Sequence, residues 1–320
     1  MIRALARGFA RFAVLLALAS VLIFLLLRAA TVHRARVALG VSARDEDVAK
    51  LSAALGLDRP LLVQYLDWIT GLLGGDFGTS LVSQENITPL VWDRAQVSLI
   101  LVGLAMALSL AIAVPVGTWL AYRHGKPDAA VLSGLVQLGI AVPSFLLAVV
   151  LVAIFAVHLG WLPAGGWLPP EYGFAGFLAR LGLPVVAVAL VQAAILTRYV
   201  RSAVLEVIEQ DYVRTARASG YTQLQALGRH GLRNATLPVL TVAGVQLATL
   251  VASAVVIERV FVLPGLSSML LDAVNSRDLP TVQSLVMVLV FFTLAVTLCV
   301  DLAYRFVDPR LRRGKVVRAS

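Results

Sequence analysis

Few residues of this 320-residue chain have the types and spacing that catalysis needs. A phosphate-binding loop requires Gly-x-x-x-x-Gly-Lys-Ser/Thr, and the nearest string, HGKPD at His124–Asp128, lacks the preceding glycine. No motif supports a hydrolase pair of Ser144 and His158. The four histidines are scattered, at His33, His124, His158 and His230. Because no His-Glu-x-x-His pattern joins them, we predict no metal centre, no cofactor and no catalytic residues, in a protein that does not hydrolyse ATP itself.

Three glutamines are the polar side chains placed deepest in long apolar segments: Gln137, Gln192 and Gln246. An amide that faces lipid is costly, so we expect all three to face the interior of a helical bundle. Two roles remain open there. The amides either form hydrogen bonds between helices or line a path along which a solute moves.

The most informative stretch, DYVRTARASGYTQLQALGRHGLRNATLP, runs from Asp211 to Pro238 between two apolar segments. It is polar, bears arginines and has helical periodicity. Lipid headgroups hold some helices of this kind at a membrane surface. The alternative is a docking element that receives the movement of a partner protein. A protein that only lets a solute cross a bilayer has little need for such a segment.

The elements around these residues are apolar. The chain is 59% apolar with a mean hydropathy of +0.88, above the roughly 45–50% of soluble domains. A helix needs about 20 mainly apolar residues to cross a bilayer. Six stretches qualify: Phe9–Leu27, Val97–Tyr122, Ala129–Leu159, Leu183–Val200, Val239–Ile257 and Val282–Val300. Because these runs are continuous rather than alternating, we predict an all-α membrane protein with six transmembrane helices.

Prolines interrupt three of these spans. Pro115, Pro143 and Pro184 lie within or at the start of them. Proline removes a backbone donor and kinks a helix. The kinks either serve packing alone or create irregular backbone that lines a path.

Basic residues gather on one side of such a bundle. They lie in the N-terminal segment, the loop after the second span, the segment after the fourth span and the C-terminal tail. The loop 31–93 on the other side has five basic and eight acidic residues. The positive-inside rule therefore predicts that both termini are cytoplasmic. This asymmetry largely explains the net charge of +9, which does not imply nucleic acid.

The first span is either a retained anchor or a cleaved signal peptide. Its length, and the lack of a prompt small-x-small site after it, favour a retained anchor. The loop after it predicts a small helical cap, with one helix from Ser42 to about Leu55 and another after Pro60. The cap either only packs on the bundle or also docks an extracytoplasmic partner. Cys299, the one cysteine, is expected to have only a packing role.

Two short amphipathic helices are expected between the fourth and fifth spans. The first covers Ala203–Ser219, and Gly220 supplies the left-handed residue that ends it. Thr222 caps the second, which closes at Asn234–Pro238. One arc of the first helix is mostly apolar or small, with Val204, Leu205, Ile208, Tyr212, Thr215, Ala216 and Ser219.

DYVRTARASG followed by RHGLRNATLP resembles the coupling-helix signature, the EAA motif, of ATP-binding-cassette importer permeases. The version is that of the dipeptide/oligopeptide/nickel branch. LGLDRPLLVQYLDWITGLLGGDFGTSL, FAVHLGWLPAGGW, VIERVFVLPGLSSMLLDAVNSRDLPTVQ and VDLAYRFVDPRLR are similar to the same branch. The strings occur in this order around six spans and extend over most of the chain, so the resemblance is specific.

The resemblance implies a type I importer permease-like fold and a subunit that translocates peptides or a related small solute, such as a nickel chelate or a glutathione-like molecule. It implies a bacterial inner-membrane location. The implied partners are a second homologous permease subunit, two ATP-binding subunits and an extracytoplasmic solute-binding protein. The residues implied in coupling to the ATPase are Asp211, Tyr212, Arg214, Thr215, Ala216 and Gly220.

Four regions follow from this comparison. They are 1–30, an N-terminal cytoplasmic tail and first span; 31–93, an extracytoplasmic loop; 94–307, a five-helix core with the coupling segment 203–237; and 308–320, a basic cytoplasmic tail. The chain departs from the general signature at its leading glutamate, here Arg214, and at its later proline, here Arg233. It also has AQVS at Ala95–Ser98 where the branch favours Leu-Pro-x-Thr, which leaves the substrate open.

Two other classes of function remain. An ion-coupled secondary transporter predicts acidic residues within the membrane and inverted halves, and the span centres here lack acidic residues. A non-transporting scaffold or receptor predicts no solute flux at all. Uptake driven by ATP or by an ion gradient separates these alternatives.

Overall fold

The structure, a computed structural model, describes residues 2–29, 44–46 and 59–307. Over these residues it is helical, with turns and one isolated bridge between Thr79 and Asn86. Five of the described helices are long and apolar enough to cross a membrane. These are α1 (Ile2–Ala29), α5 (Thr88–Tyr122), α8 (Phe174–Ile208), α11 (Leu232–Ser253) and α14 (Leu279–Val307).

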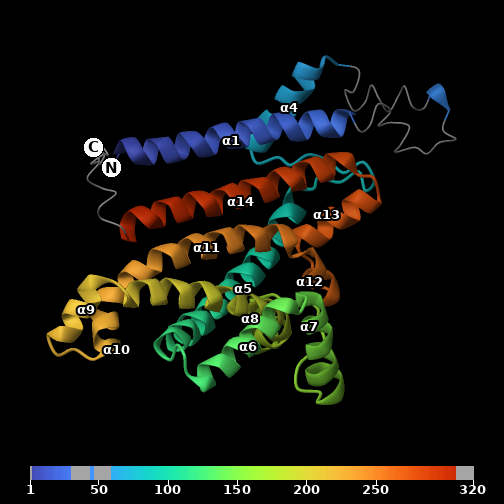
Figure 1. Cartoon of the computed structure of the whole chain (residues 1–320). Coiled ribbons are helices and arrows are strands. Elements are labelled where there is room, and N and C mark those ends of the chain that lie inside the picture. The colour runs from blue at the N-terminus through green and yellow to red at the C-terminus, as the bar shows by residue number, and fades with distance from the viewer. Residues whose placement is uncertain (1, 30–43, 47–58, 308–320) are drawn as a thin grey trace.

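The third expected span is a bent helix pair rather than one straight helix. α6 (Pro127–Ala141) and α7 (Ser144–Leu151), which continues as the π-helical η1 (Val152–His158), meet at an angle of 99°. Val142 has an extended backbone and Pro143 follows it, as expected because a residue before proline avoids the helical region. Figure 1 shows α7 turning away from α6. Pro115 and Pro184, in contrast, lie inside α5 and α8 without ending either helix.

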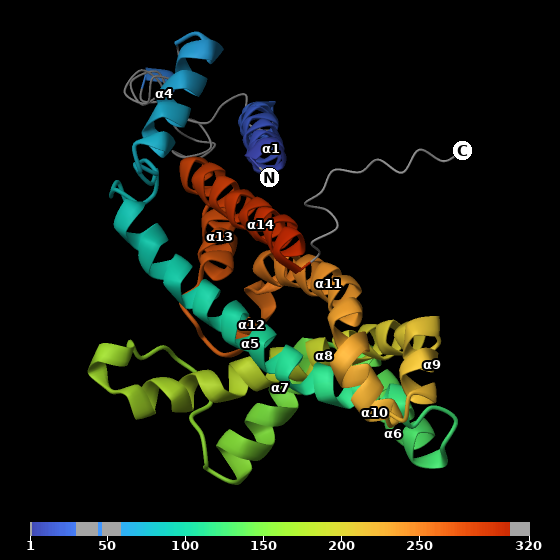
Figure 2. The same cartoon turned by 90° about the vertical axis from the view of Figure 1, so that its left-hand side faces the viewer.

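Shorter helices complete the described chain. They are α4 (Leu61–Leu73), η2 (Pro170–Tyr172), α9 (Asp211–Ala218), α10 (Gln223–Ala226), η3 (Leu227–Gly231), α12 (Val255–Val260) and α13 (Leu266–Asn275). The views place α4 at one end of the molecule and α9 and α10 at the other (Figures 1 and 2). α5 begins at Thr88, within the range expected for the outer loop. The helix expected from Ser42 to Leu55 lies outside the described residues except at 44–46, and the tail 308–320 lies wholly outside them.

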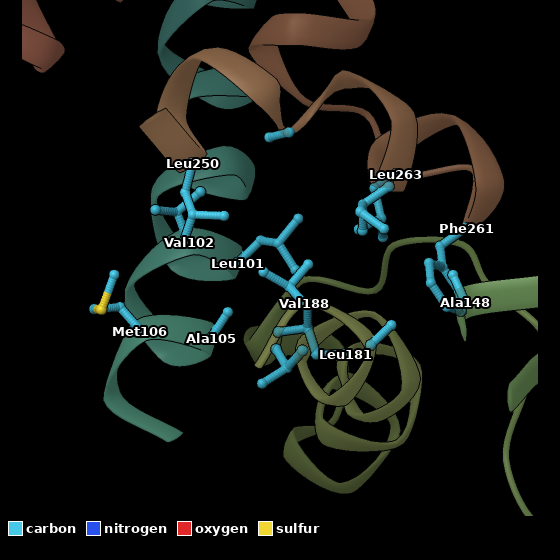
Figure 3. Packing of buried hydrophobic residues seen from close by; sticks show 14 of the residues in the cluster. Leu101, Val102, Ala105, Met106, Ala148, Leu181, Val188, Leu250, Phe261 and Leu263 are labelled. Carbon is cyan, nitrogen blue, oxygen red and sulfur yellow. The ribbon is translucent and has the colours of Figure 1, made fainter. Parts of the chain in front are cut away.

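The centre of the bundle is an apolar cluster between α5, α7, α8, α11 and α12. It includes Leu101, Val188, Leu250 and Ile257, all buried. Figure 3 shows Leu101 of α5 beside Val188 of α8. α5 and α8 also approach each other closely further along, because a Cβ at Gly117 would lie 2.7 Å from the Cβ of Val200.

A second apolar cluster lies at the end of the bundle where α5 begins beside α13 and α14. Asp278 ties the outer loop to this end. It accepts hydrogen bonds from the Ser80 hydroxyl at 2.5 Å and from the Leu81 amide at 3.0 Å. The start of α4 beyond Pro60 agrees with the expected second outer helix. Further along α4, Trp68 stacks on Phe24 of α1, which fixes α4 against the first span.

Candidate functional site

The polar segment between α8 and α11 begins with a helix break that the sequence prediction missed. A single helix over Ala203–Ser219 was expected, but α8 ends at Ile208 and α9 starts at Asp211. Between them, Gln210 has an extended backbone with φ −70° and ψ 145°. One extended residue resets the helical phase, so the side chains of α9 do not continue the faces of α8.

The break changes which face of α9 is buried. Val213 is completely buried and Ala216 is 9% exposed, whereas Tyr212, Thr215 and Ser219, expected on the inner arc, are exposed. The sequence pattern therefore predicted the burial of Ala216 correctly and missed the burial of Val213. The spacing from Val213 to Ala216 is one helical turn, and it identifies the inner face once the phase is counted from Asp211.

The inner face of α9 packs on a third apolar cluster, which we name the inner cluster. Its buried members come from α5, α8, α9, α10, η3 and α11: Ala121, Val200, Ala203, Val204, Val207, Val213, Ala216, Ala226, Leu227 and Ala235. Gly231 permits this packing, because a Cβ there would lie 2.8 Å from Val207 Cγ1. α9 is thus attached to the ends of long helices through buried apolar contacts, which transmit displacement well because packed interiors resist compression.

A glycine turn ends α9 as expected. Gly220 has φ +93°, the left-handed region. Its amide donates to the Arg217 carbonyl at 3.0 Å, and the Tyr221 amide donates to the Ala216 carbonyl at 3.3 Å. These two bonds make a Schellman motif. Nothing lies within 4 Å of a Cβ built at Gly220, so the backbone conformation alone, and not crowding, favours glycine here.

The second helix starts as expected and continues further than expected. Thr222 and Gln225 form a reciprocal capping box. α10 then runs through the π-helical η3 into α11 without closing at Asn234–Pro238, and Pro238 lies inside α11. The hydroxyl of Tyr304 on α14 donates to the Leu237 carbonyl at 3.0 Å. Packing of α11 along α14 and α8 supports this proline-bearing helix, which sequence propensity alone would end.

We name the pair of helices α9 and α10, with the glycine turn between them, the elbow. Its outward face is polar and accessible. Asp211, Tyr212, Arg214, Thr215 and Gly220 are all exposed. Arg214 lies 3.7 Å from Asp211, one turn away on the same helix, and such an exposed pair contributes little stability. The elbow therefore combines a buried apolar attachment with an exposed polar face, an arrangement suited to docking another protein.

The structure separates the three glutamines. Gln192 is 9% exposed and lines a cavity of about 80 Å³, and its Oε1 has no hydrogen-bond partner within 2–29, 44–46 and 59–307. Gln246 is half-buried on α11 and Gln137 is exposed on α6, and neither lines that cavity. The first of the two expected roles, a hydrogen bond between helices, is not fulfilled by Gln192 Oε1 in the described part of the chain.

Glu258 is a buried polar residue whose burial the sequence did not indicate. It is completely buried, on α12 beyond the apolar stretch Asn234–Val251. Burial raises the pKa of its carboxyl above the ordinary value, and hydrogen bonds from Ser98 and from backbone amides oppose that shift. Arg259 next to it is exposed and pairs with Asp272. Nothing in the local pattern distinguishes the two charges, because only the tertiary fold brings Ser98 to Glu258.

Metal ligation has no candidate among the residues that the structure describes. No group of three or more His, Cys, Asp or Glu side chains lies close enough together there to hold an ion. Cys299 is exposed on the surface of α14 rather than packed in the interior.

Two family models together match nearly the whole chain. The model for binding-protein-dependent transport system inner membrane components matches residues 113–313, and the model for the N-terminal part of such components matches residues 1–102. The two models therefore cover most of the five-helix core and the first span with the loop that follows it.

Curated relatives agree with the family models. A putative peptide transport system permease protein of Brucella abortus is 38% identical over 92% of this chain and 93% of its own length. A probable peptide ABC transporter permease protein of Sinorhizobium fredii is 35% identical over 93% of this chain and 95% of its own. The oligopeptide transport system permease protein AppB of Bacillus subtilis is 33% identical, with 91% and 93% covered.

A solved structure has the same fold. A chain from the crystal structure of an amino acid ABC transporter with histidines matches with a TM-score of 0.53. The match covers 68% of this chain and 94% of the other, at 18% identity. The helices of the core thus follow a known membrane-protein arrangement.

Proposed function

This chain belongs to the family of binding-protein-dependent transport system inner membrane components, and we propose that peptides are the solutes it carries. It is a multi-pass inner-membrane permease subunit of an ATP-binding-cassette system, and it works with a binding protein and an ATPase. The peptide class is supported by the names of relatives that are 33–38% identical over nearly their whole length. Nickel chelates and glutathione-like molecules are the related small solutes to be tested beside peptides.

The observation that carries the mechanism is the two-sided elbow formed by α9 and α10. Its inner face is held by Val213 and Ala216 in the inner cluster, and its outer face is exposed and polar. We assign coupling to the ATPase to this elbow. Asp211, Tyr212, Arg214 and Thr215 contact the ATPase, Gly220 sets the turn, and Ala216 belongs to the attachment.

Movement passes from the elbow to the spans through two routes. α8 is joined to α9 through Glu209 and Gln210, and α10 leads through η3 into α11 without a break. Closure of the ATPases on ATP displaces the elbow, and the inner cluster carries that displacement to α8 and α11 together. Because α8 and α11 flank the central apolar cluster, the same displacement reaches the cavity that Gln192 lines.

The assembly we propose has two permease subunits, this chain and a second homologous one, above two ATP-binding subunits. The solute-binding protein docks on the opposite side, over 31–93. Both termini lie in the cytoplasm, in agreement with the exposed basic residues near α9 and at Lys126. The regions 1–30, 31–93, 94–307 and 308–320 are the proposed units of this subunit, and Gln192, with Gln137 and Gln246, supplies the proposed polar residues of the path.

Transport by the reconstituted complex tests the proposal. Proteoliposomes containing the two permeases and the ATPases, supplied with the binding protein, are expected to take up a labelled di- or oligopeptide only when ATP is present on the cytoplasmic side. Nickel chelate and glutathione are assayed in parallel. If the complex takes up nickel chelate or glutathione but no peptide, that solute replaces peptides as the substrate class. Uptake in the absence of ATP would overturn the mechanism.

A further inference from the structure

A small cavity in the centre of the bundle contains an amide without a partner. The cavity has a volume of about 80 Å³, room for about two or three water molecules at roughly 30 Å³ each. Gln192 of α8 is nine-tenths buried, and its Oε1 has no hydrogen bond to any residue that the structure describes. A buried polar atom left unpaired costs about 1–3 kcal/mol. An unpaired buried amide in an otherwise apolar core therefore needs an explanation.

The other groups around the cavity are neutral. Two hydroxyl residues, Ser144 at the start of α7 and Ser253 at the end of α11, line it, and the remaining lining side chains are apolar. Glu258 is only one residue from the lining residue Ile257. Its Oε1, however, accepts from the Ser98 hydroxyl and its Oε2 from the Ser268 amide. The cavity thus offers amide and hydroxyl groups and no charge.

This chemistry complements a peptide bond. A glutamine side chain has a carbonyl acceptor and an N–H₂ donor, so it pairs with both the N–H and the C=O of another amide. An ionised terminus or side chain would enter a cavity without a counter-charge, which is strongly unfavourable. The neutral lining therefore favours a backbone amide over the charged ends of a peptide.

The cavity also lies where the helices are interrupted. Ser144 directly follows the break between α6 and α7, where the axis turns by 99°. Ser253 directly precedes Ala254, at which α11 gives way to α12. Since the cavity is bounded by the ends of these elements, relative movement of α7 and α12 changes its volume.

We propose that this cavity binds the backbone amide of a peptide in transit. Gln192 Oε1 accepts from a peptide N–H, and Gln192 Nε2 donates to the peptide C=O. This assignment rests on the proposed peptide function and adds a residue and a recognition rule to it. Because every peptide carries the same backbone, recognition by Gln192 is independent of peptide side chains.

Transport of a peptide and of its ester analogue tests the assignment. In the ester analogue one backbone N–H is replaced by oxygen, so the donor to Gln192 Oε1 is lost. Wild-type and Gln192→Leu complexes are compared with both substrates in ATP-driven uptake. The binding protein is the same in both complexes, so its own preference cancels in the ratio. We expect Gln192→Leu to lower kcat/KM about tenfold more for the peptide than for the ester analogue, which is the effect of the one hydrogen bond from the N–H that the ester lacks. Both substrates lose the bond from Gln192 Nε2 to their C=O.

Two controls separate recognition from folding. Gln192→Leu removes an unpaired polar atom and is expected to leave Tm of the purified complex unchanged or raised, and Gln192→Met serves as a second variant should the first not assemble. Thr249→Val on α11 is the matched control. Thr249 is exposed and its hydroxyl bonds only to the Val245 carbonyl of its own helix, so the preference for peptide over ester should persist.

Three outcomes overturn the assignment. Equal losses for peptide and ester would show that Gln192 has a structural role or holds only water. Wild-type values of kcat/KM for both substrates in Gln192→Leu would show that the amide does not contact the peptide. Failure of the wild type to take up any peptide would remove the proposed function itself, and it is distinguishable because it does not depend on Gln192.

Discussion

The hydroxyl of Ser98 on α5 donates a 2.6 Å hydrogen bond to the carboxylate of Glu258 on α12, 160 positions later in the chain. The same hydroxyl oxygen accepts from the Leu266 amide at the start of α13 at 2.8 Å. One buried side chain therefore joins three helices at the end of the core where α5 begins. Gly265 permits this junction, because a Cβ there would lie 2.1 Å from the Glu258 carboxyl carbon.

Replacing Ser98 by alanine is expected to destabilise the subunit by about 1–3 kcal/mol. It leaves a buried carboxylate and a buried amide each short of a partner. Thermal unfolding of the purified complex should give a lower Tm for this variant. Ser202→Ala is the control, because Ser202 is exposed and bonds only to the Arg198 carbonyl of its own helix. Equal Tm values for the two variants would show that the junction contributes no net stability.

Gly220→Asp is expected to leave insertion and folding largely intact while lowering ATP-driven uptake by tenfold or more. The strain of a non-glycine residue at φ +93° costs about 1 kcal/mol, and the exposed position has no neighbour to clash with. The loss of uptake arises because the turn presents α9 to the ATPase. ATPase activity and uptake are measured on the same preparation.

Gly228→Asp is the matched control for this variant. Gly228 lies on the same segment in η3, is exposed, and has space for a side chain without a positive φ. Normal uptake by Gly220→Asp would contradict the coupling role of the elbow. Equal losses in both variants would attribute the effect to the added charge and not to the turn.

Adjacent residues on α9 should differ in cross-linking to the ATPase. Arg214 has a side chain 69% exposed and Val213 is completely buried. In a Cys299→Ala background, Arg214→Cys labelled with a thiol-reactive photo-crosslinker is expected to capture the ATPase subunit. Val213→Cys should yield no such adduct under the same conditions. Capture from both positions, or from neither, would mean that the exposed face of α9 is not the contact.

Labelling with a membrane-impermeant maleimide tests the orientation. Val82 is exposed in the loop before α5, and Lys126 is exposed in the loop after it. In the same Cys299→Ala background, Val82→Cys should react in intact cells, whereas Lys126→Cys should react only after the membrane is permeabilised. The reverse pattern would place both termini outside the cytoplasm.

The positions of most helices could be predicted from hydropathy, because a membrane span needs a continuous apolar run wherever it packs. The end of α9 at Gly220 and the cap at Thr222 were also predicted, since each depends on one residue and its immediate neighbours. The break at Gln210 and the unbroken passage through Pro238 were not. Both depend on how α8 and α11 pack, and helix propensity at a single residue is too small to decide against such packing.

Local chemistry in the sequence by itself determined that this chain is a helical membrane protein with a polar helical segment between its fourth and fifth spans. Only the tertiary structure decided that Val213 anchors the elbow, that Glu258 is buried against Ser98, and that Gln192, of the three glutamines, faces a central cavity. The physical reason is the distance along the chain over which each effect acts. Apolar runs, caps and left-handed turns act over a few neighbouring residues, whereas burial and unpaired polar atoms depend on contacts between helices that are far apart in the chain.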